Sequence, residues 1–165
     1  TSYIPNFGNS AGATRSADSS SQTVPSGIIG QTEGTVFVEI KSDNPENAGR
    51  IIAISDGTPN NRIMIRYSSD NLLVYAQTTT QQWNYTFSRV ENMKIGIAYS
   101  NNDAVLYANG VQLNSPTSFS VPNCSKVYLG TPEDGGSSDT NLKIKDFKLY
   151  NTRLSNAELT ALTKI

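Results

Sequence analysis

Two aromatic side chains, Trp83 and Tyr85, alternate along a short run that is rich in amide side chains. Because successive side chains of a β-strand point to opposite faces, Trp83 and Tyr85 share one face of this run. The amides that flank them are Gln81, Gln82 and Asn84. An aromatic ring packs against the C–H face of a sugar while amides pair with its hydroxyls, so the run could hold a carbohydrate. Phe87 continues the same face, and burial of that face in a core is the open alternative.

A second polar cluster lies in the loop predicted between residues 55 and 62. Its Gly and Pro shape a turn, and its side chains offer hydrogen-bond partners for hydroxyls. These side chains are Asp56, Asn60, Asn61 and Arg62. Loops at the rim of a rigid scaffold present such side chains without disturbing the core. The candidate carbohydrate-binding residues are therefore this loop together with Trp83, Asn84 and Tyr85.

The composition removes several classes of chemistry. The chain has no histidine, which excludes nucleophile systems that need an imidazole base and histidine-based zinc sites. Charged residues make up 16% and the formal net charge is −1, so we expect no nucleic-acid partner. No apolar run approaches the roughly 18 residues that a membrane span needs, so we expect no membrane insertion.

The elements that must position these residues are short strands. Residues 93–113 read as two consecutive β-hairpins, and Asn109-Gly110 is a strong signal for a two-residue type I′ turn. The softer turn at residues 100–103 gives a compatible register. The predicted pairs are Tyr99 with Ala104, Ile97 with Leu106, Ala108 with Val111, and Leu106 with Leu113. The outer face, which carries Val105 and Tyr107, is only partly polar.

Further alternating runs at all-β spacing predict an all-β fold, a two-sheet antiparallel β-sandwich with one short C-terminal helix. The expected strands are residues 35–41, 50–55, 62–67, 71–77, 82–87 and 126–130. A change of phase in the last strand predicts a β-bulge near Lys145-Asp146. Ser155 and Glu158 form a capping box, which predicts a helix over residues 156–162.

The chain divides into a leader and a sandwich domain. Residues 1–27 are rich in small polar residues and are expected to form an extended leader packed on the domain formed by residues 28–165. The expected anchors of the leader are Tyr3, Ile4, Phe7 and Val24. Because the chain starts without Met, it is expected to be a piece of a longer protein.

Several short motifs of this chain resemble those of the laminin G-like, pentraxin-like branch of the concanavalin A-like lectin/glucanase superfamily. In that branch a strand carrying N-G precedes a strand ending in L-G, and a D-x-x-x-Y-N-x-x-L-S-x-x-E-L segment closes a jelly roll. The matching positions are Asn109-Gly110, Leu129-Gly130, Asp146, Tyr150-Asn151, Leu154-Ser155 and Glu158-Leu159. The resemblance covers about residues 28–165 and implies the jelly-roll sandwich. It says little about function, since the fold carries several.

The resemblance also bears on catalysis and metals. Laminarinase-type members carry two glutamates in an E-x-D-x-x-E motif, which this chain lacks, and in its first half Glu39 is the only carboxylate inside an expected strand. We therefore expect no catalytic residues and no enzyme activity. No cofactor or metal is expected either. Ca²⁺ is the alternative, with oxygen ligands from Asp56, Asn60 and Asn61, or from Glu133, Asp134 and Asp139.

The leader, at residues 1–8 and 13–18, is similar to a linker common in bacteriophage and prophage tail-fibre or tailspike proteins. That resemblance implies a receptor-binding (adhesin) domain in the distal C-terminal part of a virion fibre, with host cell-surface polysaccharide as partner and a homotrimer in the parent protein. The partly apolar outer face that carries Val105 and Tyr107 also motivates the trimer. The alternative is a structural, trimerisation or assembly domain of a tail protein that has no ligand of its own.

Overall fold

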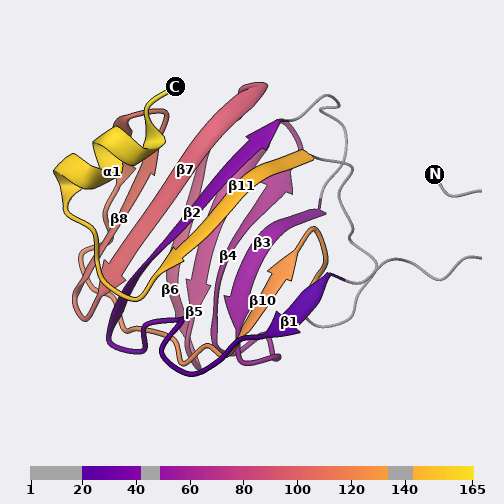
Figure 1. The fold of residues 1–165 in the computed structure, drawn as a ribbon, viewed down its shortest axis with the longest axis vertical. Coiled ribbons are helices and arrows are strands. Elements are labelled where there is room, and N and C mark those ends of the chain that lie inside the picture. Colours follow the sequence, from indigo (N-terminus) through magenta and orange to yellow (C-terminus); the bar gives the residue numbers. More distant parts are fainter. Residues whose placement is uncertain (1–19, 42–48, 134–142) are drawn as a thin grey trace, which may run out of the picture.

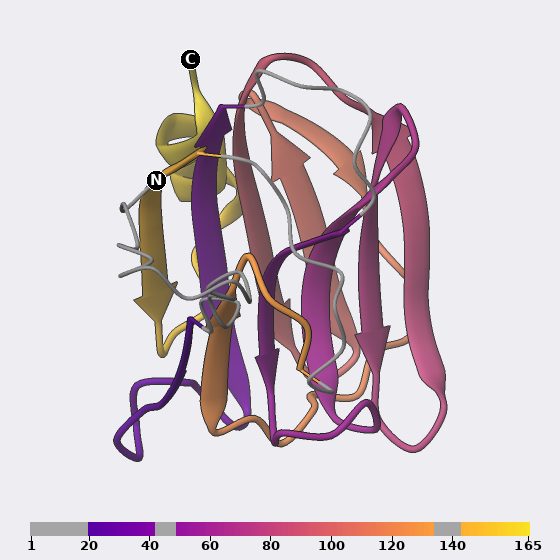
Figure 2. The same cartoon turned by 90° about the vertical axis from the view of Figure 1, so that its right-hand side faces the viewer.

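The computed structural model describes residues 20–41, 49–133 and 143–165, and these form two antiparallel sheets packed face to face (Figures 1 and 2). The six-stranded sheet has the order β1-β10-β3-β4-β5-β6. Its strands are β1 Ser21–Thr23, β10 Lys126–Leu129, β3 Gly49–Ser55, β4 Arg62–Ser68, β5 Asn71–Gln77 and β6 Gln81–Ser88. The two-sheet antiparallel sandwich is therefore confirmed.

The five-stranded sheet has the order β11-β2-β7-β8-β9. Its strands are β11 Lys143–Tyr150, β2 Glu33–Lys41, β7 Asn92–Ser100, β8 Asp103–Ala108 and β9 Val111–Asn114. The main core lies between the two sheets and is built by the inward residue of each alternation, for example Val36 and Val38 of β2 and Ile63 and Ile65 of β4. Each such side chain contributes roughly 1.5–3 kcal/mol on burial, which fixes the register of both sheets.

The central hairpins follow the predicted register except in the last strand. Asn109 and Gly110 have φ of 51° and 82°, as the predicted type I′ turn requires. Three of the four predicted pairs are confirmed, but Leu106 pairs with Asn114 instead of Leu113, because the register shifts between Leu106 and Tyr107. Leu113 is half-buried and packs against the main core, as expected, whereas Val111, which was also expected on the core face, is 60% exposed.

The C-terminal helix α1, Asn156–Thr163, covers the outer face of the five-stranded sheet over strands β7, β8 and β9 (Figure 2). The predicted capping box is present at Ser155 and Glu158. Leu159 of the helix packs in a separate apolar cluster with Ala98, Val105 and Tyr107. A Cβ added at Gly96 would lie 3.1 Å from both Leu159 and Thr163, so a glycine there lets the helix approach the sheet closely.

Strand β11 and the N-terminal segment test two further predictions. The predicted bulge in β11 is confirmed by a register shift between Ile144 and Asp146. Part of the expected leader, Ser21–Thr23, forms edge strand β1 beside β10, and Val24 packs against the main core. The anchors Tyr3, Ile4 and Phe7 lie outside the described residues, and the boundary at residue 27 stays a prediction. Within the described ranges, no helix is long and apolar enough to cross a membrane.

Candidate functional site

Polar side chains from neighbouring strands gather on the outer face of the six-stranded sheet. In β4 and β5 every second residue is apolar and faces the main core, and the residues between them point to the outer face, where Met64 and Leu73 are also buried in a second apolar cluster. Arg62 and Gln77 form one cross-strand pair, and Tyr75 lies opposite Asn84 of β6. These four side chains, contributed by three adjacent strands, form what we call the outer-face patch. Asn84 is exposed, and the other three are half-buried.

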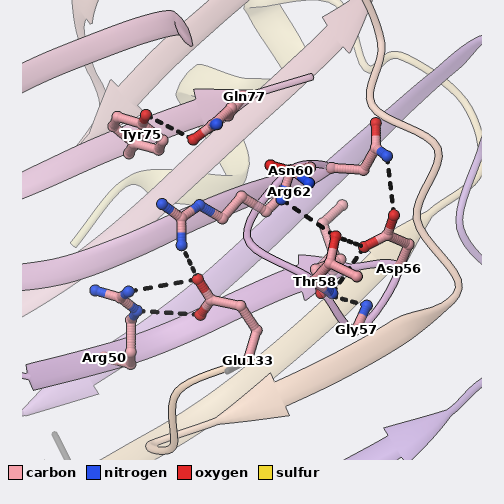
Figure 3. A network of polar contacts seen from close by, with 12 residues as sticks. Arg50, Asp56, Gly57, Thr58, Asn60, Arg62, Tyr75, Gln77 and Glu133 are labelled. Carbon is pink, nitrogen blue, oxygen red and sulfur yellow. Dashed lines mark hydrogen bonds and ion pairs between the residues drawn. The ribbon is translucent and has the colours of Figure 1, made fainter. Parts of the chain in front are cut away.

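A buried carboxylate anchors one side of the outer-face patch (Figure 3). Glu133, in the segment after β10, accepts hydrogen bonds from Arg50 Nε at 3.1 Å and Arg50 Nη2 at 3.4 Å. It also accepts one from Arg62 Nη1. The Glu133 side chain is fully buried, while the side chains of Arg50 and Arg62 are each 12% exposed. This network ties the segment after β10 to strands β3 and β4.

The protonation state of Glu133 follows from these contacts. Burial alone would raise the pKa of this carboxyl, but its own backbone N–H and the two guanidinium groups of Arg50 and Arg62 outweigh burial and lower the pKa. The group is therefore ionised near neutral pH. It has no proton to donate, and its oxygens are occupied, so it serves as a structural anchor and not as an acid catalyst.

Arg62 also connects this anchor to Tyr75. The Arg62 guanidinium lies 4.9 Å from the centre of the Tyr75 ring, a cation–π contact. The Tyr75 hydroxyl donates to Gln77 Oε1 at 2.7 Å. Since that bond uses the carbonyl end of the Gln77 amide, the NH₂ end has no hydrogen-bond partner among the described residues. The patch thus combines one aromatic ring with an available amide donor.

In the loop before β4, residues 56–61, some side chains are hydrogen-bonded within the loop and others are exposed. Asp56 accepts hydrogen bonds from the backbone and hydroxyl of Thr58, at 2.8 and 2.7 Å, and from Asn61 Nδ2 at 2.8 Å. Burial raises the pKa of Asp56, and these hydrogen bonds lower it by more. Asp56 and Asn61 therefore hold the loop in shape, whereas Asn60 is exposed at its tip and available to a ligand.

The structure does not bring the metal ligands proposed from the sequence together in one site. Asp56 is engaged within its loop, and Glu133 is held by two guanidinium groups. Asp134 and Asp139 lie outside the described residues. In the parts of the chain that the structure describes, no group of three or more His, Cys, Asp or Glu side chains could hold a metal ion.

Trp83 and Tyr85 lie on the opposite, inner face of β6, so the proposed stacking surface has to be corrected. Trp83 is 4% exposed, and its Nε1 donates to Asn114 Oδ1 at 2.8 Å. Its ring meets Phe119 edge to face, with centroids 6.2 Å apart. Tyr85 is half-buried and stacks on Phe87. The alternative in which this face is buried is the one observed, because Phe87 continues the apolar alternation into the core.

The residues expected to bind a ligand therefore do not share one face of the six-stranded sheet. Asn84 and Arg62 lie on the outer face, with Asn60 in the adjoining loop, while Trp83 and Tyr85 face the core. Sequence reasoning missed Tyr75 and Gln77, although their alternation with the apolar residues of β5 was a signal for the outer face. Glu133 was considered only as a Ca²⁺ ligand, and nothing in the local sequence could have indicated its contact with Arg62, which is 71 residues away.

Known structures share this architecture. The carbohydrate-binding module CBM40 of the Ruminococcus gnavus IT-sialidase, bound to α2,3-sialyllactose, is 16% identical with a TM-score of 0.62, over 82% of this chain and 84% of that one. Domain 4 of AbnA, a GH43 extracellular arabinanase from Geobacillus stearothermophilus, in complex with arabinotriose, is 16% identical with a TM-score of 0.67, over 86% and 71%. The NanB sialidase of Streptococcus pneumoniae is 19% identical with a TM-score of 0.68, and the match covers 88% of this chain but 26% of that enzyme.

At these identities the similarity concerns the fold. No curated protein matches the sequence. A family model described as the concanavalin A-like lectin/glucanases superfamily matches residues 15–160, which include every strand described above and the first part of the helix. With two antiparallel sheets and the closing helix in place, the chain belongs to the concanavalin A-like lectin/glucanases superfamily.

Proposed function

We propose that this domain is a non-catalytic receptor-binding module that recognises glycan through the outer-face patch of its six-stranded sheet. The observation that carries the proposal is the placement of Arg62, Tyr75, Gln77 and Asn84 on one face, beside the exposed Asn60. A phenol ring offers an apolar surface to sugar C–H groups, and the amides and guanidinium pair with hydroxyls. The strands hold these groups rigidly, which favours binding because little conformational entropy is lost.

The similar structures support the same class of ligand. Two of them are described as bound to oligosaccharides, sialyllactose in one case and arabinotriose in the other. Both are modules or domains of larger enzymes and cover most of the present chain. A binding role without catalysis also agrees with Glu133, since an ionised carboxylate held by two arginines is a poor proton donor.

The biological setting in this proposal is a bacteriophage or prophage tail fibre or tailspike. It is supported by the similarity of residues 1–8 and 13–18 to tail-fibre linkers. The partner is then host cell-surface polysaccharide, and the parent protein is a homotrimer located in the virion. One argument for the trimer is lost, because helix α1 of the same chain covers the apolar face that carries Val105 and Tyr107.

The test is binding of the labelled domain to bacterial cells with and without stripped surface polysaccharide, followed by titration with the glycan identified on an array. Tyr75→Ala is expected to weaken binding by about 1–3 kcal/mol, as for an aromatic side chain in an interface. Gln77→Ala is expected to weaken it by about 1 kcal/mol. Gln112→Ala, which removes an exposed glutamine from the other sheet, is the matched control.

Equal binding by the wild type and the Tyr75 and Gln77 variants would rule out the outer-face patch as the binding surface. Absence of binding to every array glycan and to intact cells, combined with stable self-association of the domain, would favour the assembly role instead.

A further inference from the structure

Among the described residues, three guanidinium groups gather around the carboxylate of Glu133. Arg50 and Arg62 both bind this carboxylate, and Arg66 lies beside them as the cross-strand partner of Arg50. Arg66 makes no hydrogen bond or ion pair with any described residue, and its Nε is buried without a partner. Three guanidinium groups therefore surround one carboxylate, and the third has no counter-charge within the described part of the chain.

Arg66 is electrostatically unfavourable in this position. Burial lowers the pKa of its guanidinium, and the nearby charges of Arg50 and Arg62 lower it further, while Glu133 opposes them. The buried Nε of Arg62 also has no partner. Buried donors that have lost water without gaining an acceptor destabilise the protein, and the deficit is recovered when an acceptor arrives. An anion is the acceptor that satisfies both the hydrogen bonding and the charge.

The position of Arg66 relates it to the outer-face patch. On β4, Arg66 is two residues beyond Met64, which pairs with Tyr75. Two residues along a strand span about 7 Å, so a ligand over Tyr75 lies within reach of the long Arg66 side chain. Opposite Arg66 lies Leu73, and the exposed Thr86 follows on β6. Neither of these neighbours carries a charge that could neutralise the arginine.

We infer that the saccharide recognised at this face carries an anionic group, and that Arg66 binds this group. The inference rests on the proposed glycan-binding function. The group is an oxyanion attached to a sugar, either a carboxylate or a phosphate, because a guanidinium presents paired N–H donors that match both. Tyr75 and Gln77 contact the sugar itself, and Arg66 selects for its charge. Glu133 keeps Arg50 and Arg62 in place and is not displaced.

The experiment uses the wild-type chain with matched pairs of saccharides. Uronate oligosaccharides are compared with their methyl esters, and sugar phosphodiesters are compared with their dephosphorylated forms. The expected result is binding to one of the acidic forms about tenfold to a hundredfold more tightly than to its neutral partner, the range of one charge-assisted contact. The pair that shows the preference distinguishes a carboxylate from a phosphate. Because this comparison changes only the ligand, it does not depend on the folding of a variant.

Two variants and one control then locate the contact. Arg66→Gln is expected to remove the preference for the acidic form while leaving binding of the neutral form unchanged. Arg66→Lys is expected to retain part of the preference, since it keeps the charge and loses the paired donors. Lys148→Gln removes one positive charge from an exposed position on the other sheet and is expected to change nothing.

The outcomes separate this inference from the function on which it rests. Equal binding of acidic and neutral forms by the wild type would overturn the anionic subsite and leave glycan binding intact. A preference that survives Arg66→Gln, or that Lys148→Gln reduces equally, would overturn the role of Arg66. Absence of binding to any saccharide would overturn the proposed function, and the subsite with it.

Discussion

Replacement of Trp83 by alanine separates a core residue from a sugar-binding one. The indole is 4% exposed, packs edge to face on Phe119 and donates a hydrogen bond to Asn114. Truncation of a buried tryptophan costs about 3–5 kcal/mol, including the cavity that it leaves. Since each kcal/mol shifts the melting temperature of a domain of this size by roughly 2–4 °C, we expect a decrease of about 6–20 °C.

The assay is thermal and urea unfolding followed by far-UV circular dichroism, because Trp83 is the only tryptophan and its fluorescence is lost in the variant. Trp83→Phe keeps an aromatic ring and removes the N–H donor, so it should cost less, about 1–2 kcal/mol. Glycan binding of both variants, measured well below their melting temperatures, should equal that of the wild type. An unchanged melting temperature together with lost binding would refute the assignment of this side chain to the core.

Three further predictions concern contacts outside the main core. Glu133→Gln should cost about 3–5 kcal/mol at pH 7 because it leaves two buried guanidinium groups without their counter-charge. Since the pKa of Glu133 is lower in the folded than in the unfolded protein, its contribution is present above the ordinary carboxyl value of 4.5 and is lost as the pH falls through the folded value. Urea midpoints of wild type and variant should therefore converge in acid, and a constant difference would contradict the ion pair. Ser155→Ala should cost about 0.5–2 kcal/mol in the same assay, as loss of an N-cap does. An unchanged urea midpoint would show that the helix contributes nothing to stability. Gly96→Val should displace helix α1 and increase amide exchange at Leu159, whereas Gly110→Ala, at a φ of 82°, should strain only its turn.

Local sequence patterns predicted most of the fold because each strand carries its own signal. The Asn109-Gly110 turn, the phase change near Lys145 and the Ser155 capping box each depend on residues within a few positions of one another. The shift that moved Leu113 away from Leu106 could not be seen in this way. A bulge in a short edge strand depends on what the neighbouring strand and loop require, and the alternation of four residues does not record it.

The candidate site was less predictable for a different reason. Trp83 could have been on either face, and only the packing of the second sheet decides which face of β6 is inside. Asn84 and Arg62 were identified because their polar character is local. Glu133 and Arg50, in contrast, meet across 83 residues of sequence, and such a contact follows from the order of the strands and not from a motif.

The strand order has a consequence for the synthesis of the chain. Strand β2 pairs with β7 and β11, and β3 pairs with β4 and β10, so both early strands have partners that emerge from the ribosome much later. The meander from β3 to β6 can form as soon as it is made, because its neighbours are adjacent in sequence. The edges of β2 and β3 stay open until the last strands arrive, which exposes them to pairing with other chains. We therefore expect folding of this domain to be slow and to be completed only after β11 has been synthesised, with the addition of β10 and β11 closing both sheets on the same side of the sandwich.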